Sequence, residues 1–141
     1  MDVFEGSLER VFIEDLKRLK KRPKLFWRNI NSIGGDAFKG LIELEEIDIP
    51  EGITQIGKNA FGECFRLRRV SLPKTLLKIE SDAFEECSLL QQVDVLNSDC
   101  TIGENAFYGC GNLKFVGLPK EMVKINDSLF FGCGSLFAID I

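Results

Sequence analysis

The amino-acid sequence predicts an α/β solenoid, in which about five coils stack along one axis. Three observations lead to this prediction. Apolar residues recur at a fixed interval of 23 residues, a short strand pattern recurs within each interval, and a candidate helix start follows at a constant place. Repeats of this length are typical of solenoids, because a single coil cannot bury its own apolar face. We expect one parallel sheet, with short helical turns on the opposite side.

Several apolar columns define the repeat. They stay in phase without an insertion, so we assign residues 33–141 to the solenoid, with repeats starting at 33, 56, 79, 102 and 125. Residues 30–33 also match residues 76–79, so the solenoid starts half a turn before Ile33. The columns are Ile33, Ile56, Ile79, Ile102 and Ile125; Phe38, Phe61, Phe84, Phe107 and Phe130; and Leu44, Leu67, Leu90, Leu113 and Leu136.

Each repeat carries one strand signal and one turn signal. The segment Arg69-Val70-Ser71-Leu72 alternates polar and apolar residues, which predicts a strand with Val70 and Leu72 pointing inward. Equivalent strands would stack in parallel about 4.8 Å apart. A residue favoured at helix N-caps precedes each Ala-Phe or Leu-Phe pair, which predicts a capped helical turn there. These residues are Asp36, Asn59, Asp82, Asn105 and Ser128.

The first 32 residues do not follow the period. Their apolar residues are spaced as on one face of an amphipathic helix that ends before Pro23. Because the end of a solenoid core needs a cover, we interpret residues 1–32 as an N-terminal helical cap. The apolar positions are Leu8, Val11, Phe12, Leu16 and Leu19.

The repeat resembles the BspA-like leucine-rich repeats over residues 33–141. The motif that carries the resemblance is Cys64-x-x-Leu67-x-x-Val70-x-Leu72-Pro73-x-x-Leu76-x-x-Ile79, followed by Ala83-Phe84-x-x-Cys87. The resemblance implies a non-catalytic recognition solenoid whose relatives are often surface or adhesion proteins. It implies no particular ligand.

Composition narrows the function classes. The chain has 141 residues, 45% of them hydrophobic, with a net charge of −4 and no histidine. Disorder and dedicated nucleic-acid binding are therefore disfavoured, and the commonest catalytic base and metal ligand is missing. We expect no enzyme activity and no cofactor. The N-terminus lacks the pattern of a signal peptide, which favours an intracellular location, although the family is often surface-exposed.

The cysteines form a further column, with one cysteine in each of four coils. A line of single cysteines does not converge on one point as zinc ligands do. We interpret them as reduced, buried and metal-free, with Leu41 in the same column of the first repeat. Cys100 lies outside the column, in an irregular turn, where we expect it to point inward. The column is Cys64, Cys87, Cys110 and Cys133.

The outward residues of the strands are the candidate binding site, because solenoids commonly bind partners on the concave strand surface. Phe115 is notable, since an aromatic residue there has no role in the core and aromatics are enriched at binding hot spots. A harmless exposed residue is the competing interpretation. The candidates are Glu46, Asp48, Arg69, Ser71, Gln92, Asp94, Phe115 and Asp140.

Three functions remain open. The first is recognition of another protein or surface ligand, adhesion- or scaffold-like, through the concave face. The second is assembly with a second copy or a larger parent chain through the C-terminal end. The third and weakest is binding of nucleic acid or anionic membrane by a basic cluster. The alternative interpretation of this cluster is a solvated helix end, whose positive charges complement the helix dipole. The cluster is Lys17, Arg18, Lys20, Lys21, Arg22 and Lys24.

Overall fold

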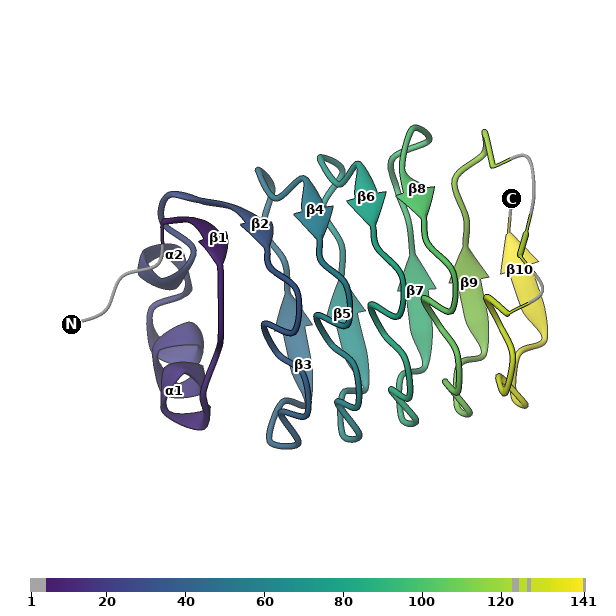
Figure 1. Cartoon of the computed structure of the whole chain (residues 1–141), viewed down its shortest axis with the longest axis horizontal. Coiled ribbons are helices and arrows are strands. Elements are labelled where there is room, and N and C mark those ends of the chain that lie inside the picture. The colour runs from purple at the N-terminus through teal and green to yellow at the C-terminus, as the bar shows by residue number, and fades with distance from the viewer. Residues whose placement is uncertain (1–4, 123–124, 127, 141) are drawn as a thin grey trace.

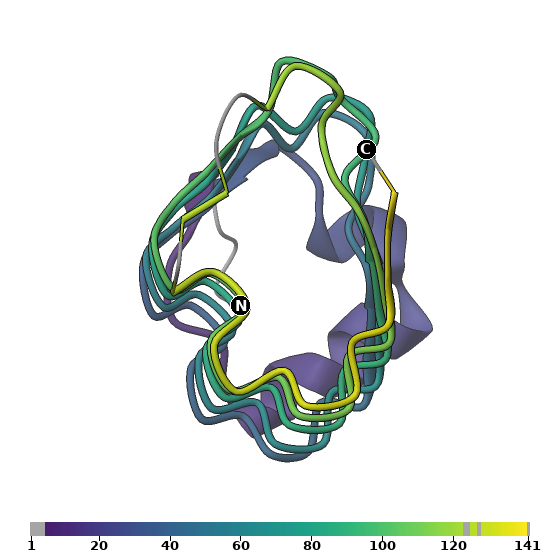
Figure 2. The same cartoon turned by 90° about the vertical axis from the view of Figure 1, so that its right-hand side faces the viewer.

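The computed structural model describes residues 5–122, 125–126 and 128–140. It is a β-solenoid of about six turns with parallel sheets, one turn more than the five counted in the sequence. The turns follow one another along the long axis, with two helices at the N-terminal end (Figure 1). Viewed along that axis, successive turns superpose around a common interior (Figure 2), which buried apolar side chains occupy.

One face of the solenoid is a five-stranded parallel sheet in the order β1-β2-β4-β6-β8. The isoleucine column lies in this sheet: Ile33 pairs with Ile56, Ile56 with Ile79, and Ile79 with Ile102. The sequence predicted only one sheet; the strands of this second sheet end just before the Ala-Phe pairs, where the backbone forms turns. Its strands are β1 (Gly6–Leu8), β2 (Ile30–Ile33), β4 (Gln55–Ile56), β6 (Lys78–Ile79) and β8 (Thr101–Ile102).

The other face carries the strands that the alternating pattern predicted, and their positions are confirmed. The first four strands bury their middle residue, as Val70 and Val93 show, whereas Ile139 in the last strand is 41% exposed. They pair in parallel and in register: β3 pairs with β5, β7 with β9, and β9 with β10. The strands are β3 (Glu46–Asp48), β5 (Arg69–Ser71), β7 (Gln92–Asp94), β9 (Phe115–Gly117) and β10 (Ala138–Asp140).

The prediction of N-capped helical turns is wrong. An N-cap residue has an extended backbone, whereas the residues before the Ala-Phe pairs have φ near +60°. The backbone makes a left-handed turn at each of these positions, and its amides bond to the next coil; Phe61 N–H donates to Ala83 O at 2.8 Å. Asn and Asp suit both conformations, because their short polar side chains tolerate the left-handed region. The left-handed residues are Asp36, Asn59, Asp82 and Asn105.

The N-terminal segment combines a strand with two helices. The predicted helix begins later than its apolar pattern indicated, because residues 6–8 form strand β1 beside β2. Helix α1 spans Ile13–Lys21 and helix α2 spans Pro23–Phe26. The α1 start is fixed by Asp15, whose carboxylate accepts a 2.8 Å hydrogen bond from the Phe12 amide. Leu16, Phe26 and Trp27 join the solenoid core. That residues 1–32 act as a cap stays a prediction.

Two ladders fill the interior. The phenylalanine rings stack almost parallel, with centroid distances rising from 4.7 Å between Phe38 and Phe61 to 6.0 Å between Phe107 and Phe130. Each column cysteine donates its thiol to the phenylalanine carbonyl of the preceding coil, as Cys87 does to Phe61 at 3.0 Å. The predicted burial is confirmed for four cysteines, and Cys133 is partly exposed. The buried four are Cys64, Cys87, Cys100 and Cys110.

Candidate partner-binding surface

The eight candidate residues all lie on one surface. We call it the β3–β10 face: the outward side of β3, β5, β7, β9 and β10. Its side chains are in register, so Glu46 lies beside Arg69, and Gln92 beside Phe115. Strands β5 and β7 are also neighbours, since Gln91 N–H donates to Arg68 O at 3.2 Å. All eight candidates are exposed.

At the N-terminal half of this face the charges pair with one another. Arg69 donates to the Asp48 carboxylate at 2.8 Å and lies 3.5 Å from Glu46. Ser71 donates to the same Asp48 oxygen at 2.9 Å. These two hydrogen bonds lower the pKa of Asp48 below its usual 3.8. Arg69 is therefore occupied within the chain, so the charged side chains of this half of the face are paired with one another.

The C-terminal half is different, because two aromatic rings are exposed there. Phe115 and Phe137 pack edge to face, with centroids 4.7 Å apart. Their exposed fractions are 42% and 71%. Phe137 was not among the sequence candidates, and it directly precedes β10. Nearby, Gln92 donates to Asp94 at 2.8 Å, while Asp140 lies at the end of β10.

The residues of the basic cluster line two different hollows. Lys17, Lys21 and Arg22 line a small hollow beside α1, about 240 Å³ in volume, together with Arg18. Arg18 also pairs with Asp15 at 3.3 Å. The two remaining lysines of the cluster line a different and larger pocket. The division weakens the case for a nucleic-acid or membrane patch.

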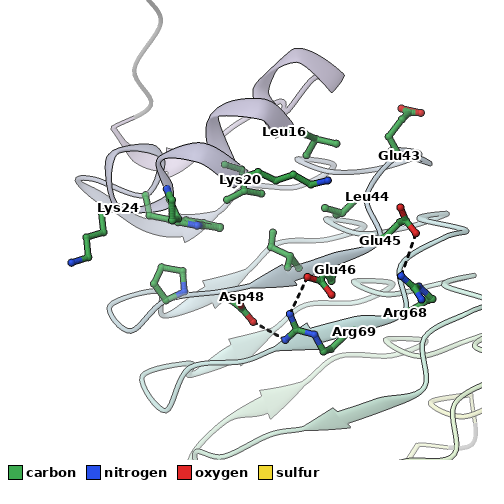
Figure 3. A pocket seen from close by; sticks show the side chains of 15 residues that line it. Leu16, Lys20, Lys24, Glu43, Leu44, Glu45, Glu46, Asp48, Arg68 and Arg69 are labelled. Atoms are coloured by element: carbon green, nitrogen blue, oxygen red, sulfur yellow. Dashed lines mark hydrogen bonds and ion pairs between the residues drawn. The ribbon is translucent and has the colours of Figure 1, made fainter.

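That larger pocket lies between the helices and the first coils, and sequence reasoning missed it. Its volume is about 760 Å³. Leucines of α1 and Trp27 line one side, and β3 with Arg68 and Arg69 at the start of β5 lines the other. In Figure 3, Glu45 turns toward Arg68, and Glu46 and Asp48 turn toward Arg69. No signal in the sequence relates the helix to β3, since the helix lies outside the repeat that aligns β3 with the later strands.

The described residues offer no evident site for other chemistry. Within these residues, no three His, Cys, Asp or Glu side chains are grouped so that they could hold a metal ion. The thiols are poor nucleophiles, because burial raises the pKa of Cys64 to about 12 and that of Cys100 to about 11. In the same part of the chain, no helix has the length and apolar character needed to cross a membrane.

Comparison with known proteins decides the family. The model of the BspA type leucine-rich repeat region matches residues 24–137 in six copies. The chain belongs to this family. Proteins built from leucine-rich repeats are generally protein-interaction modules and are typically non-enzymatic. The family assignment thus confirms the resemblance seen in the 23-residue motif, although the match begins earlier than residue 33.

Solved structures share this BspA-type fold. A leucine-rich cell surface protein from Faecalibacterium prausnitzii is 26% identical, with a TM-score of 0.75 over 80% of this chain and 30% of its own. A leucine-rich repeat protein from Bacteroides ovatus is 30% identical, with a TM-score of 0.69 over 82% and 33%. A T. pallidum leucine-rich repeat protein is 27% identical, with a TM-score of 0.61 over 79% and 63%.

The chain thus spans between about a third and just under two thirds of these relatives. No curated protein matches it.

Proposed function

We propose that this BspA-type repeat chain is a non-catalytic recognition module that binds another protein through the β3–β10 face. The contact between Phe115 and Phe137 carries the proposal. Exposed aromatic rings that are already held against each other bury a large area on binding and lose little side-chain freedom. An adhesion-like role is supported by the similar cell surface protein of F. prausnitzii.

The location of the aromatic pair favours the C-terminal half of the face over the N-terminal half. Binding at Arg69 would first have to break its bonds to Asp48 and Glu46. The exposed charges of that network are screened by water and contribute little energy. We therefore assign the energetic centre to Phe115 and Phe137, and the ionic half to orientation of the partner.

Photo-crosslinking tests this proposal. Benzoyl-phenylalanine would replace Phe115 in one variant and Lys78, exposed in β6 on the opposite sheet, in another. We expect a discrete protein adduct from position 115 and none from position 78. The purified partner should then bind Phe115→Ala and Phe137→Ala at least tenfold more weakly, and Leu77→Ala as well as wild type. Adducts from position 78 alone would place the site elsewhere.

A second candidate function is assembly through the β10 edge of the sheet. Among the described residues β10 is an edge strand, and its Ile139 is 41% exposed, as is Phe131 of the same coil at 61%. Exposed apolar side chains at a strand edge favour contact with another chain. Sedimentation over a hundredfold concentration range tests this. Association that Ile139→Lys abolishes would support it, and a monomer at every concentration would rule it out.

A further inference from the structure

Asp48 and Asp94 occupy the same position of the repeat, two coils apart, but only Asp48 is paired with a basic residue. The Asp48 carboxylate accepts hydrogen bonds from Arg69 and Ser71 of the following coil, at 2.8 and 2.9 Å. After Asp94, the residues at the two corresponding positions of the following coil are Phe115 and Gly117. Neither of them has a side-chain donor. The repeat therefore presents the same carboxylate twice and supplies its donors once.

One oxygen of the Asp94 carboxylate has no partner among the described residues. Its Oδ2 accepts a 2.8 Å hydrogen bond from the amide of Gln92, and no donor reaches Oδ1. This Oδ1 leans over β9, since it would lie 2.8 Å from a Cβ atom added at Gly117. In the second coil the hydroxyl of Ser71 lies at the corresponding place. The exposed Asp94 carboxylate is therefore open to a donor from outside the chain.

The charges around Gly117 select a cation. Asp140 lies beside Gly117 on the side opposite to Asp94, because both residues pair in register with it. Neither carboxylate forms an ion pair with any residue that the structure describes. Strands β7, β9 and β10 contain no basic residue. Lys114 precedes β9 and is three residues from Gly117, about 10 Å along the strand.

Phe115 offers an aromatic surface beside the same carboxylate. Its ring packs edge to face against Phe137 and is 42% exposed. It stands two residues before Gly117 on the same side of β9, because alternate residues of a strand share a face. Arginine suits this combination better than lysine, since its planar guanidinium both binds a carboxylate in a bidentate manner and stacks on an aromatic ring.

We propose that the partner protein inserts an arginine at this point, paired with the Asp94 carboxylate and stacked on Phe115. The inserted side chain takes the role that Arg69 has toward Asp48 within the chain. Asp140 adds negative charge on its other side. The inference rests on the proposed function, since it names the residue that the partner presents to the aromatic pair.

Two dipeptide probes test the inference without the partner. The ¹⁵N-labelled chain would be titrated with acetyl-Leu-Arg-amide and with acetyl-Leu-citrulline-amide, whose side chain has the same planar shape without the charge. The backbone amide cross-peak of Gly117 reports on the site. We expect a saturable shift with the arginine probe. The citrulline probe should bind about 3–30-fold more weakly, because it forms neither the ion pair nor the cation–π contact.

Variants identify the groups that bind. Asp94→Asn should weaken binding of the arginine probe by about 2–5-fold, as for an exposed ion pair. Gly117→Ser should weaken it as well, since the new hydroxyl can donate to Asp94 as Ser71 donates to Asp48. The control is Asp82→Asn, in the turn after β6, which removes the same charge at a position where neighbouring coils carry asparagine. It should leave the affinity unchanged.

Three results would overturn the inference. They are a Gly117 cross-peak that does not move, equal affinity for the two probes, or an Asp94→Asn variant that binds the arginine probe as tightly as the wild type. The crosslink from position 115 separates this inference from the proposed function. A discrete adduct together with a failed titration rejects the arginine and leaves the aromatic site standing. Adducts from position 78 alone reject the aromatic site itself.

Discussion

The guanidinium of Arg69 donates a 2.8 Å hydrogen bond to the carboxylate of Asp48, one coil earlier in the solenoid. The repeat makes this contact possible, because in-register strands bring side chains 21 and 23 residues apart onto one carboxylate, Ser71 being the second donor. Both charged side chains are more than half exposed. Their pairing therefore adds little stability, but it determines the ionisation of Asp48.

Arg69→Met should raise the pKa of Asp48 toward its ordinary 3.8, because the largest cause of the lowering is removed. Carboxyl-carbon NMR titration measures this directly. The folded-state pKa lies below the unfolded value, so the stability from the pair is present above about pH 3.8 and is lost as the pH falls through the folded pKa. Wild type and variant should converge there. Arg66→Met, on a residue 3.9 Å from Glu45, is the control.

Glycine substitutions test the left-handed turns. Gly40 has a φ of +70°, and a methyl group added there would meet no atom within 4 Å. Gly40→Ala should therefore destabilise the fold by about 1 kcal/mol through backbone strain alone. Gly134 has equal space without the positive φ, so Gly134→Ala should be neutral or stabilise by about 0.4–1 kcal/mol. Urea unfolding measures both, and equal effects would argue against the turns.

The left-handed turns also show where sequence reasoning ended. The columns were predictable, because a period of 23 residues fixes which side chains share the interior. The positive φ of Asn59 was not predictable, because asparagine is favoured both at helix N-caps and in the left-handed region. Glu63 and Glu86 adopt positive φ as well, with no residue type to indicate it.

The N-terminal segment and the pocket were unpredictable for a different reason. Leu8 fits a helical spacing with Leu16, yet it lies in a strand because β2 offers a partner 25 residues away. The sequence did not indicate that Trp27 lines a pocket, since this depends on how α1 is placed against β3. The strand-face residues, such as Phe115, follow from alternation within one repeat. Long-range placement outside the repeat cannot be derived in this way.

The thiols should be unreactive in the folded protein. Burial raises the pKa of every cysteine above 9.0, so little thiolate is available to a disulfide reagent near pH 8. Only the partly exposed Cys133 should react within minutes, and all five after denaturation. Cys133→Ser should remove the fast phase. A fast phase that survives this substitution would show that another cysteine is accessible.

The same burial predicts weaker stability at alkaline pH. The folded-state pKa values of Cys64 and Cys100, about 12 and about 11, lie above the reference value of 9.0. Ionisation of these thiols therefore favours the unfolded chain. Their contribution to the free energy of unfolding is fully present below about pH 9 and is lost as the pH rises toward about 12. Measuring the free energy of unfolding at pH 8 and pH 10.5 gives its dependence on pH. Cys64→Ala should reduce this dependence, and an unchanged dependence would show that other ionisable groups cause it.

Phenylalanine substitutions test the interior ladder. Phe84 is fully buried and stacks between Phe61 and Phe107 at 5.1 and 5.6 Å. Phe84→Ala should cost about 3–5 kcal/mol, since the cavity lies in the middle of a stack that cannot collapse. Phe130→Ala should cost less, because that ring is only partly buried and lies 6.0 Å from Phe107. The exposed Phe65 is the control, expected within about 0.5 kcal/mol of wild type. Equal costs at residues 84 and 130 would mean that the stack is packed as tightly at its C-terminal end as at its centre.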